Sequence, residues 1–307
     1  MKNPIIPMAD PFVLLHEGKY YLYGTTDFNR DNNTTEYEGK DGVRVFVSED
    51  LEHWELGGYC LKKGDTIGEH NFWAPELLYK NGKFYMAYTS EEHVGIAVSD
   101  SPTGPFTQTE RKWICPDYAI DGHFLDEGDK VYLYYVRVRG THNTKGNTIF
   151  VAEMSADMTE IVQETETMLI RAEDAYPWEV RDSHVAEGPF VLKHNGKYYL
   201  SYSANHTRSH DYAVGYAVSD SPAGPFVRYP GNPILKSGAG LYGAGHHSFT
   251  TSKDGEHLIC AYHVHNSAEK LRPRLFCADA AEFIKNPNGG DDILVIHGPS
   301  EESTAKI

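Results

Sequence analysis

The amino-acid sequence predicts an all-β protein folded as a single five-bladed β-propeller over residues 1–307. Three observations favour this fold: one strand–turn–strand pattern recurs five times, tight-turn dipeptides join its two strands, and no segment keeps a helical period. The 21 Tyr and 13 Phe residues, many of them in pairs, also suit pleated strands better than helix bundles.

The recurring pattern is a polar residue at the start of an apolar strand, followed by a turn and an aromatic-rich strand. The five polar residues that start its copies are Asp10, Glu76, Asp121, Glu187 and His246. In three copies the turn is Asn-Gly or Asp-Gly, at residues 81–82, 195–196 and 254–255. These dipeptides favour tight hairpins because glycine accepts a positive φ. A two-sheet sandwich is the alternative, but it does not explain why each copy starts with a polar group.

A second repeat supports the number of blades. Residues 99–106, Ser-Asp-Ser-Pro-Thr-Gly-Pro-Phe, return nearly unchanged at 219–226. Five copies in 307 residues give a period of about 60 residues, the size of a four-stranded blade with long loops. We therefore expect one domain whose blades begin near residues 9, 73, 119, 186 and 243.

The composition excludes several classes of partner. The formal net charge of −16 repels phosphate backbones and anionic lipids, so we expect no nucleic-acid or membrane partner. No stretch approaches the roughly 18 apolar residues of a membrane span. The N-terminus lacks the apolar region of a signal peptide, so a cytoplasmic location is expected, although a chain trimmed of its signal would look the same.

The cysteines and most histidines give no metal-binding pattern. Cys60, Cys115, Cys260 and Cys277 lie far apart, and buried thiols in a reducing compartment are favoured over two disulfides. His206, His210, His263 and His265 are predicted in loops near the blade tops, where they could shape sugar subsites.

The polar residues that start the repeats are expected to converge. The innermost strands of a propeller surround one axis, so these residues should crowd one end of it. Buried carboxylates that lie close together cannot all ionise at the same pH, and their pKa values are forced apart. Such a cluster can hold an acid and a base in one site.

Five short motifs make the chain resemble glycoside hydrolase family 43. They stand in the order found in that family: Ala9-Asp10-Pro11, Trp73-Ala74-Pro75-Glu76, Ile120-Asp121-Gly122, Ala186-Glu187-Gly188-Pro189 and Gly245-His246. The resemblance implies that Asp10 is the general base, Asp121 orients the acid and tunes its pKa, and Glu187 is the general acid of an inverting hydrolase. The alternatives are that both aspartates cap turns and that Glu187 is a surface acid.

The resemblance also implies residues that bind the substrate. Trp73 would line the sugar subsite, Arg274 would reach the active site, and Phe28 would form an apolar wall beside the sugar. For Arg274 the alternative is an exposed charge on an edge strand, with Arg272 as its rival. His246 would lie beneath the site, beside substrate, a water cluster or a water-mediated structural calcium. No cofactor is expected to be required, and the role of Glu76 stays open.

The predicted function is removal of pentose units from arabinose- or xylose-containing oligosaccharides. An α-L-arabinofuranosidase is favoured, because the larger β-xylosidases of the family usually carry a C-terminal sandwich that this chain is too short to hold. A β-xylosidase or an endo-arabinanase is the alternative within the family. A catalytically silent sugar-binding propeller is the alternative from another class. A protein-interaction propeller is disfavoured because no Trp-Asp or kelch-type repeat occurs.

Overall fold

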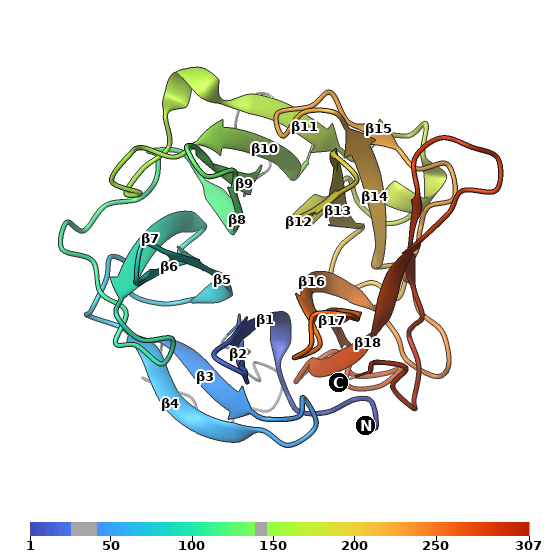
Figure 1. The fold of residues 1–307 in the computed structure, drawn as a ribbon, viewed down its shortest axis with the longest axis horizontal. Coiled ribbons are helices and arrows are strands. Elements are labelled where there is room, and N and C mark those ends of the chain that lie inside the picture. Colours follow the sequence, from blue (N-terminus) through green and yellow to red (C-terminus); the bar gives the residue numbers. More distant parts are fainter. Residues whose placement is uncertain (26–41, 139–145, 307) are drawn as a thin grey trace.

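Five antiparallel sheets surround a central axis in the computed structural model, which describes residues 1–25, 42–138 and 146–306 (Figure 1). Four of these sheets have four strands and one has three. Within the described residues the helical segments are two short 3₁₀ turns, Gln163–Thr165 and Pro177–Glu179. The prediction of an all-β, five-bladed propeller is therefore confirmed. No helix in these ranges is long and apolar enough to cross a membrane.

Each blade is a meander in which chain order follows the path from the axis outward. Blade 1 consists of β1 (Ala9–His16), β2 (Lys19–Thr25), β3 (Gly42–Ser48) and β4 (Glu55–Lys62). Blade 2 consists of β5 (Trp73–Lys80), β6 (Lys83–Ser90) and β7 (His93–Ser99). Blade 3 consists of β8 (Ala119–Asp126), β9 (Val131–Arg137), β10 (Thr148–Glu153) and β11 (Thr167–Arg171). Blade 4 consists of β12 (Ala186–His194), β13 (Lys197–Ala204), β14 (Ala213–Ser219) and β15 (Val227–Arg228). Blade 5 consists of β16 (Gly245–Thr251), β17 (Leu258–Val264), β18 (Leu275–Ile284) and β19 (Ile293–Ile296).

Blade 2 departs from the predicted four strands. Its fourth position is filled by two isolated bridges, Gly95 to Trp113 and Val98 to Thr107. Thr107 and Trp113 belong to the segment after the octapeptide, which in blade 4 forms the short strand β15 (Val227–Arg228). The outer edge of this blade is therefore covered by a loop that touches it at two points.

The N-terminal segment closes the propeller against the last blade. The backbone N–H of Ile5 donates to Phe276 O at 2.7 Å, and that of Met8 donates to Arg274 O at 3.0 Å. Asn3 N–H donates to Glu301 O at 2.8 Å, so both ends of the chain lie on blade 5 (Figure 1). These bonds satisfy backbone groups that an open edge strand would leave exposed.

The repeated octapeptide docks each of its two blades onto the preceding blade. The buried Tyr23 of blade 1 donates its hydroxyl to Pro102 O at 2.5 Å, and the buried Tyr134 of blade 3 donates to Pro222 O at 2.6 Å. Gly104 has φ +78°, and a Cβ there would lie 2.2 Å from the Cys60 carbonyl oxygen of blade 1. The repetition seen in the sequence therefore reflects one interblade contact used twice.

The apolar core lies between the sheets and at their inner strands. Phe190 of β12 meets Phe249 of β16 edge to face, with ring centroids 5.5 Å apart. All four cysteines lie in the described ranges; they are buried and free of disulfide bonds. These thiols contribute to the core as small apolar side chains.

Candidate active site

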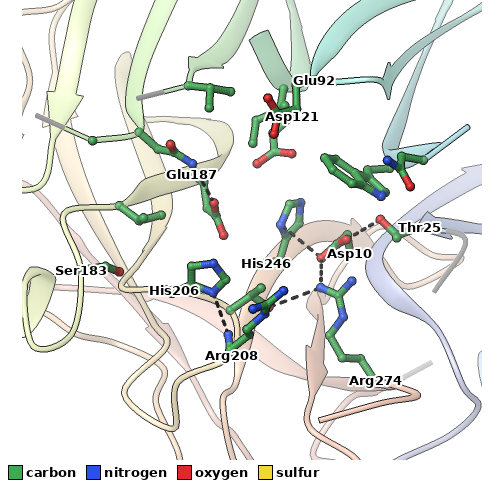
Figure 2. A pocket seen from close by; sticks show the side chains of 18 of the residues that line it. Asp10, Thr25, Glu92, Asp121, Ser183, Glu187, His206, Arg208, His246 and Arg274 are labelled. Carbon is green, nitrogen blue, oxygen red and sulfur yellow. Dashed lines mark hydrogen bonds and ion pairs between the residues drawn. The ribbon is translucent and has the colours of Figure 1, made fainter. Parts of the chain in front are cut away.

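A cavity of about 660 Å³ opens where the inner strands begin, a size within the usual range for small-molecule sites (Figure 2). All three predicted catalytic carboxylates line it, and so do three of the four predicted substrate-binding residues: Asp10, Asp121, Glu187, Trp73, Arg274 and His246. Phe28, the fourth, lies outside the described residues. Arg272, considered as a rival of Arg274, also lines the cavity.

A bulge at the start of every inner strand turns side chains toward this cavity. In each of the five strands the pairing register shifts within the first five residues. Each bulge contains one residue in the left-handed region: Asp10 (φ 48°), Ala74 (φ 40°), Asp121 (φ 58°), Gly188 (φ 55°) and His246 (φ 45°). For a residue other than glycine this conformation costs about 1–3 kcal/mol and persists only where the surroundings enforce it.

The five bulges are tied together by a ring of hydrogen bonds between blades. Each left-handed residue donates its backbone N–H to a side chain of the preceding blade. The bonds are Asp10 N to His263 Nδ1 (3.2 Å), Ala74 N to Thr25 Oγ1 (2.9 Å), Asp121 N to Thr89 Oγ1 (3.0 Å), Gly188 N to Asp121 Oδ2 (3.1 Å) and His246 N to Ser203 Oγ (2.8 Å). The ring fixes the relative positions of all five strand starts.

The five polar residues that start the repeats were predicted to occupy equivalent positions, and this prediction is wrong for two of them. Asp10, Asp121 and His246 occupy the same bulge position, whereas Glu187 stands one residue before it and Glu76 two residues after it. Glu76 does not line the cavity; its carboxylate lies 2.6 Å from Nδ1 of the buried His123. His123 Nε2 in turn accepts the Val191 N–H at 3.0 Å. Glu76 is therefore a partly buried partner of the buried His123 and does not belong to the carboxylates that line the cavity.

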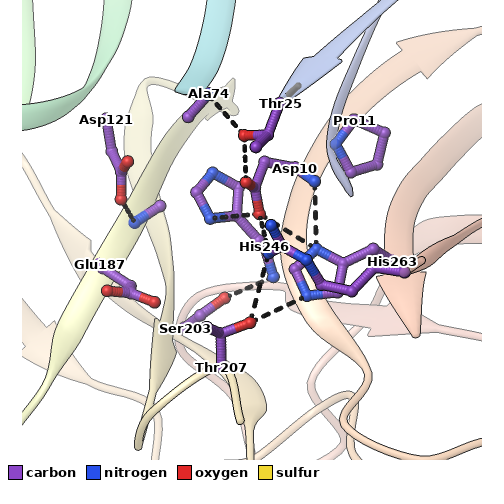
Figure 3. Close-up of polar contacts among 12 residues, drawn as sticks. Asp10, Pro11, Thr25, Ala74, Asp121, Glu187, Ser203, Thr207, His246 and His263 are labelled. Carbon is purple, nitrogen blue, oxygen red and sulfur yellow. Dashed lines mark hydrogen bonds and ion pairs between the residues drawn. The ribbon is translucent and has the colours of Figure 1, made fainter. Parts of the chain in front are cut away.

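Asp10 is held as a carboxylate by its neighbours (Figure 3). Arg274 Nη1 lies 2.8 Å from Oδ1, His246 Nδ1 lies 3.3 Å from the same oxygen, and the Thr25 hydroxyl donates to Oδ2. Burial alone would raise the pKa of this carboxyl, but the Arg274 guanidinium and the rings of His246 and His263 hold its pKa well below its usual range. The group is therefore ionised at neutral pH.

His263 was expected in a loop, but it lies near the end of β17 with no exposed surface. Its Nδ1 is 3.2 Å from both the backbone nitrogen and Oδ1 of Asp10, and its Nε2 is 3.4 Å from the Thr207 hydroxyl. Burial and the Arg274 charge lower the pKa of His263 to about 4, so the ring is neutral at pH 7. It accepts the Asp10 N–H and fixes the backbone of that residue.

The pKa of Glu187 is shifted in the opposite direction to that of Asp10. Burial, aided by the charge of Asp10, raises the pKa of its carboxyl to about 7, although hydrogen bonds from Tyr212 and Asn147 oppose this rise. The Tyr212 hydroxyl donates to Oε1 at 2.9 Å, and Asn147 Nδ2 lies 3.4 Å from Oε2. A substantial fraction of this group is therefore protonated at neutral pH.

Asp121 is coupled to Glu187. Burial first, and then the negative charges of Glu187 and Asp10, raise the pKa of Asp121 well above its usual range, while the Gly188 N–H opposes this rise. We expected Asp121 to act as a fixed negative charge that raises the pKa of Glu187. The structure adds that Glu187 acts on Asp121 in turn, so the two carboxyls influence each other's titration, and the tuning role of Asp121 stays a prediction.

The surroundings of His246 do not suit calcium, which prefers six to eight oxygen ligands. The carboxylate nearest its ring, that of Asp10, is already paired with the Arg274 guanidinium. Burial lowers the pKa of His246, and the residues that the structure describes contain no cluster of three or more His, Cys, Asp or Glu side chains arranged to hold a metal. The calcium prediction gains no support here, and no chemical step is assigned to a metal.

Four residues that position Glu187, Asp10 or their neighbours were not predicted from the sequence: Thr25, Asn147, Thr207 and Tyr212. None belongs to a recurrent motif, because each reaches the site from a loop or from the end of a second strand. Gly245 carried an indirect signal for Tyr212. A Cβ at Gly245 would lie 2.4 Å from the Tyr212 ring, and a glycine inside a strand often marks such close approach.

Comparison with known proteins gives one consistent result. The chain matches the sequence profile described as Glycosyl hydrolases family 43 over residues 1–280. A curated "Xylosidase/arabinosidase" of Bacteroides ovatus is 30% identical, with 74% of this chain and 79% of the relative covered. A "Beta-xylosidase" of Xylanibacter ruminicola is 28% identical, with 82% and 86% covered.

Solved structures agree with the profile. A structure described as an endo-1,4-beta-xylanase from Bacteroides thetaiotaomicron superposes with a TM-score of 0.85 at 37% identity, with 100% of both chains covered. A thermostable family-43 glycoside hydrolase superposes with a TM-score of 0.85 at 36% identity, with 99% of this chain and 98% of the other covered. These similarities extend over the strands that carry the cavity.

Proposed function

The chain belongs to glycoside hydrolase family 43, and from this membership we propose that it hydrolyses arabinose- or xylose-containing oligosaccharides with inversion of configuration. The observation that carries the proposal is the opposite electrostatic tuning of two carboxyls that line one cavity. The pKa of Asp10 is held well below its usual range, whereas that of Glu187 is raised to about 7. Such a pair supplies a base and an acid at the same pH.

The reaction needs one proton donor and one proton acceptor. Asp10 takes a proton from a water molecule while the water oxygen forms its bond to the anomeric carbon. The bond from that carbon to the leaving oxygen breaks, and Glu187 gives its proton to that oxygen. Arg274, 2.8 Å from Asp10, keeps the base ionised before the reaction.

Inversion requires room for the water between the two carboxyls. In inverting glycosidases this separation is roughly 6.5–9.5 Å, whereas in retaining enzymes it is about 5 Å. NMR observation of the first-formed anomer tests this point directly. A product of retained configuration would contradict the assignment of Asp10 as a base toward water.

Two lines of support bear on the sugar. We propose α-L-arabinofuranosidase activity as the principal function, since relatives named arabinoxylan arabinofuranohydrolase and extracellular exo-alpha-(1->5)-L-arabinofuranosidase match 83% and 87% of this chain. β-Xylosidase activity is the second candidate, because the relatives from Bacteroides ovatus and Xylanibacter ruminicola carry that activity in their names. The residues of the cavity described here do not by themselves distinguish the two pentoses.

One assay separates these candidates. Release of p-nitrophenol from the α-L-arabinofuranoside and from the β-xyloside, measured side by side, gives the ratio of the two kcat/KM values. A higher value for the arabinofuranoside supports the principal function, and the reverse ratio supports the second. Binding of pentose oligosaccharides without any hydrolysis would favour a non-catalytic propeller.

A further inference from the structure

An aromatic cluster lies beside the cavity, outside the residues that line it. Tyr118 immediately precedes β8, and 51% of its surface is exposed. Its ring lies 4.8 Å from the ring of His93, which starts β7, and His93 stacks on Trp113 at 5.2 Å with an interplanar angle of 21°. Three aromatic rings, those of Tyr118, His93 and Trp113, are therefore grouped at one place, and an exposed group of aromatic rings can form a binding surface.

The cluster is continuous with the cavity wall. Glu92, next to His93, and Ile120, two residues after Tyr118, both line the cavity. The backbone N–H of Ala119 donates to Glu92 O at 2.8 Å, which ties the start of β8 to the start of β7. Tyr118 and His93, from the neighbouring blades 3 and 2, therefore lie next to residues that line the cavity.

Two contacts fix the orientation of the His93 ring in this cluster. His93 Nδ1 lies 2.9 Å from the Glu91 carbonyl oxygen, and the ring of His93 is also stacked on that of Trp113. Tyr118 contacts the ring of His93, which is itself held in place. The Tyr118 side chain therefore loses little conformational freedom when a ligand covers it. Its hydroxyl makes no hydrogen bond within the described ranges and can reach a ligand hydroxyl.

We propose that Tyr118 and His93 form an outer sugar subsite for a neutral pentose unit at least one residue beyond the scissile bond, on the leaving-group side. This inference rests on the proposed function, which places the terminal sugar in the cavity. The apolar C–H face of a sugar ring covers an aromatic ring, and the hydroxyl groups at its edge bind polar partners such as a tyrosine hydroxyl. The charge of −16 is compatible with a neutral glycan but not with an anionic polymer.

The kinetic test compares a pentose oligosaccharide of at least three units with the matching p-nitrophenyl pentoside, which carries no pentose unit beyond the scissile bond. In Tyr118→Ala we expect the ratio of kcat/KM for the oligosaccharide to kcat/KM for the pentoside to fall about tenfold. Tyr118→Phe should keep most of the ratio because it keeps the ring. Tyr79→Ala is the matched control: this tyrosine is 47% exposed and lies at the end of β5 opposite Trp73. An unchanged ratio in Tyr118→Ala would overturn the subsite.

A binding test separates the subsite from the proposed function. Isothermal titration calorimetry of the same oligosaccharide is made on Glu187→Gln and on the double variant with Tyr118→Ala. We expect Kd to rise about tenfold in the double variant. Equal affinities would overturn the subsite even if the wild type is an active hydrolase. Absence of hydrolysis by the wild type would overturn the proposed function, and the titration would still decide on Tyr118.

Discussion

The hydroxyl of Tyr212 donates a 2.9 Å hydrogen bond to Oε1 of Glu187, and its ring stacks on His263, which accepts the backbone N–H of Asp10. The Tyr212 and His263 rings are 5.7 Å apart with an interplanar angle of 11°. One buried stack therefore supports both carboxyls to which acid and base roles are assigned. Tyr212 donates to Oε1 of Glu187 and Asn147 donates to Oε2, so both carboxyl oxygens have a partner that orients the group.

Tyr212→Phe should move the basic limb of the pH profile to higher pH. A hydrogen bond donated to a carboxylate stabilises its charged form, so its loss raises the pKa of Glu187 above the present value of about 7. Protonated Glu187 then persists to higher pH, while kcat falls because the acid is less well oriented. The measurement is kcat/KM against pH for wild type and variant on one substrate. A basic limb that moves to lower pH would contradict this role of Tyr212.

Glu187→Ala should lose most activity on natural oligosaccharides, about 10²- to 10⁴-fold, but much less on substrates with a good leaving group. A nitrophenolate departs without protonation, so it does not need the acid. The measurement is kcat/KM on an oligosaccharide and on a dinitrophenyl pentoside. Glu92, another carboxyl that lines the cavity, is the matched control, since Glu92→Gln should not discriminate between leaving groups. Equal losses on both substrates in Glu187→Ala would refute the acid role.

Arg274→Gln should move the acidic limb to higher pH. The guanidinium lies 2.8 Å from Asp10 Oδ1 and is the strongest of the groups that lower the pKa of this carboxyl against its burial. Without it, Asp10 takes up a proton at higher pH and the base is lost earlier on acidification. Arg272→Gln is the comparison, because Arg272 lines the same cavity but is not among the main groups that lower the pKa of Asp10. Equal shifts of the acidic limb in both variants would show that the effect is not specific to the Arg274–Asp10 pair.

Gly104→Ala should destabilise the propeller more than Gly82→Ala does. Both glycines have φ +78°, so both substitutions carry the strain of a left-handed alanine, about 1–2 kcal/mol. At Gly82 the new Cβ meets no atom within 4 Å, but at Gly104 it meets the Cys60 carbonyl oxygen at 2.2 Å. We expect an additional loss of about 1–3 kcal/mol at Gly104 from this overlap. Urea unfolding of the two variants measures the difference, and equal midpoints would rule out a close interblade contact at the octapeptide.

The fold and the meeting of Asp10, Asp121 and Glu187 in one cavity could be predicted from the sequence because a repeat carries them, whereas their catalytic roles were implied by the family resemblance and remain predictions. Asp10, Asp121 and Glu187 stand at strand starts that recur with recognisable turns, so periodicity alone predicts that they meet. The bulges could not be predicted in the same way, since a left-handed aspartate has no distinctive sequence pattern. For this reason the one-residue offset of Glu187 and the two-residue offset of Glu76 were missed.

The supporting residues were harder to predict for a different reason. Thr25 and Tyr212 contact the carboxyls across blade boundaries, and their sequence separations from Asp10 and Glu187 follow no period. The electrostatic coupling between Asp121 and Glu187 likewise depends on burial, which a motif does not report. The candidate catalytic carboxyls are therefore easier to predict from the sequence than the side chains that position them.

Asp121→Asn should move the basic limb to lower pH. In the wild type two buried carboxyls influence each other, so the last proton of the pair is retained to a higher pH than either carboxyl would hold it alone. The Asn side chain keeps the shape and can still accept the Gly188 N–H, which donates to Asp121 Oδ2 at 3.1 Å. It cannot ionise, so Glu187 then loses its proton without a neighbouring negative charge to oppose the loss. The acidic limb should hardly move, because the pKa of Asp10 is governed by Arg274, His246 and His263. The profile of kcat/KM against pH for Asp121→Asn checks both limbs on one substrate. If the basic limb stays in place while activity falls, Asp121 acts only through geometry or sugar binding, and burial with the charge of Asp10 accounts for the raised pKa of Glu187.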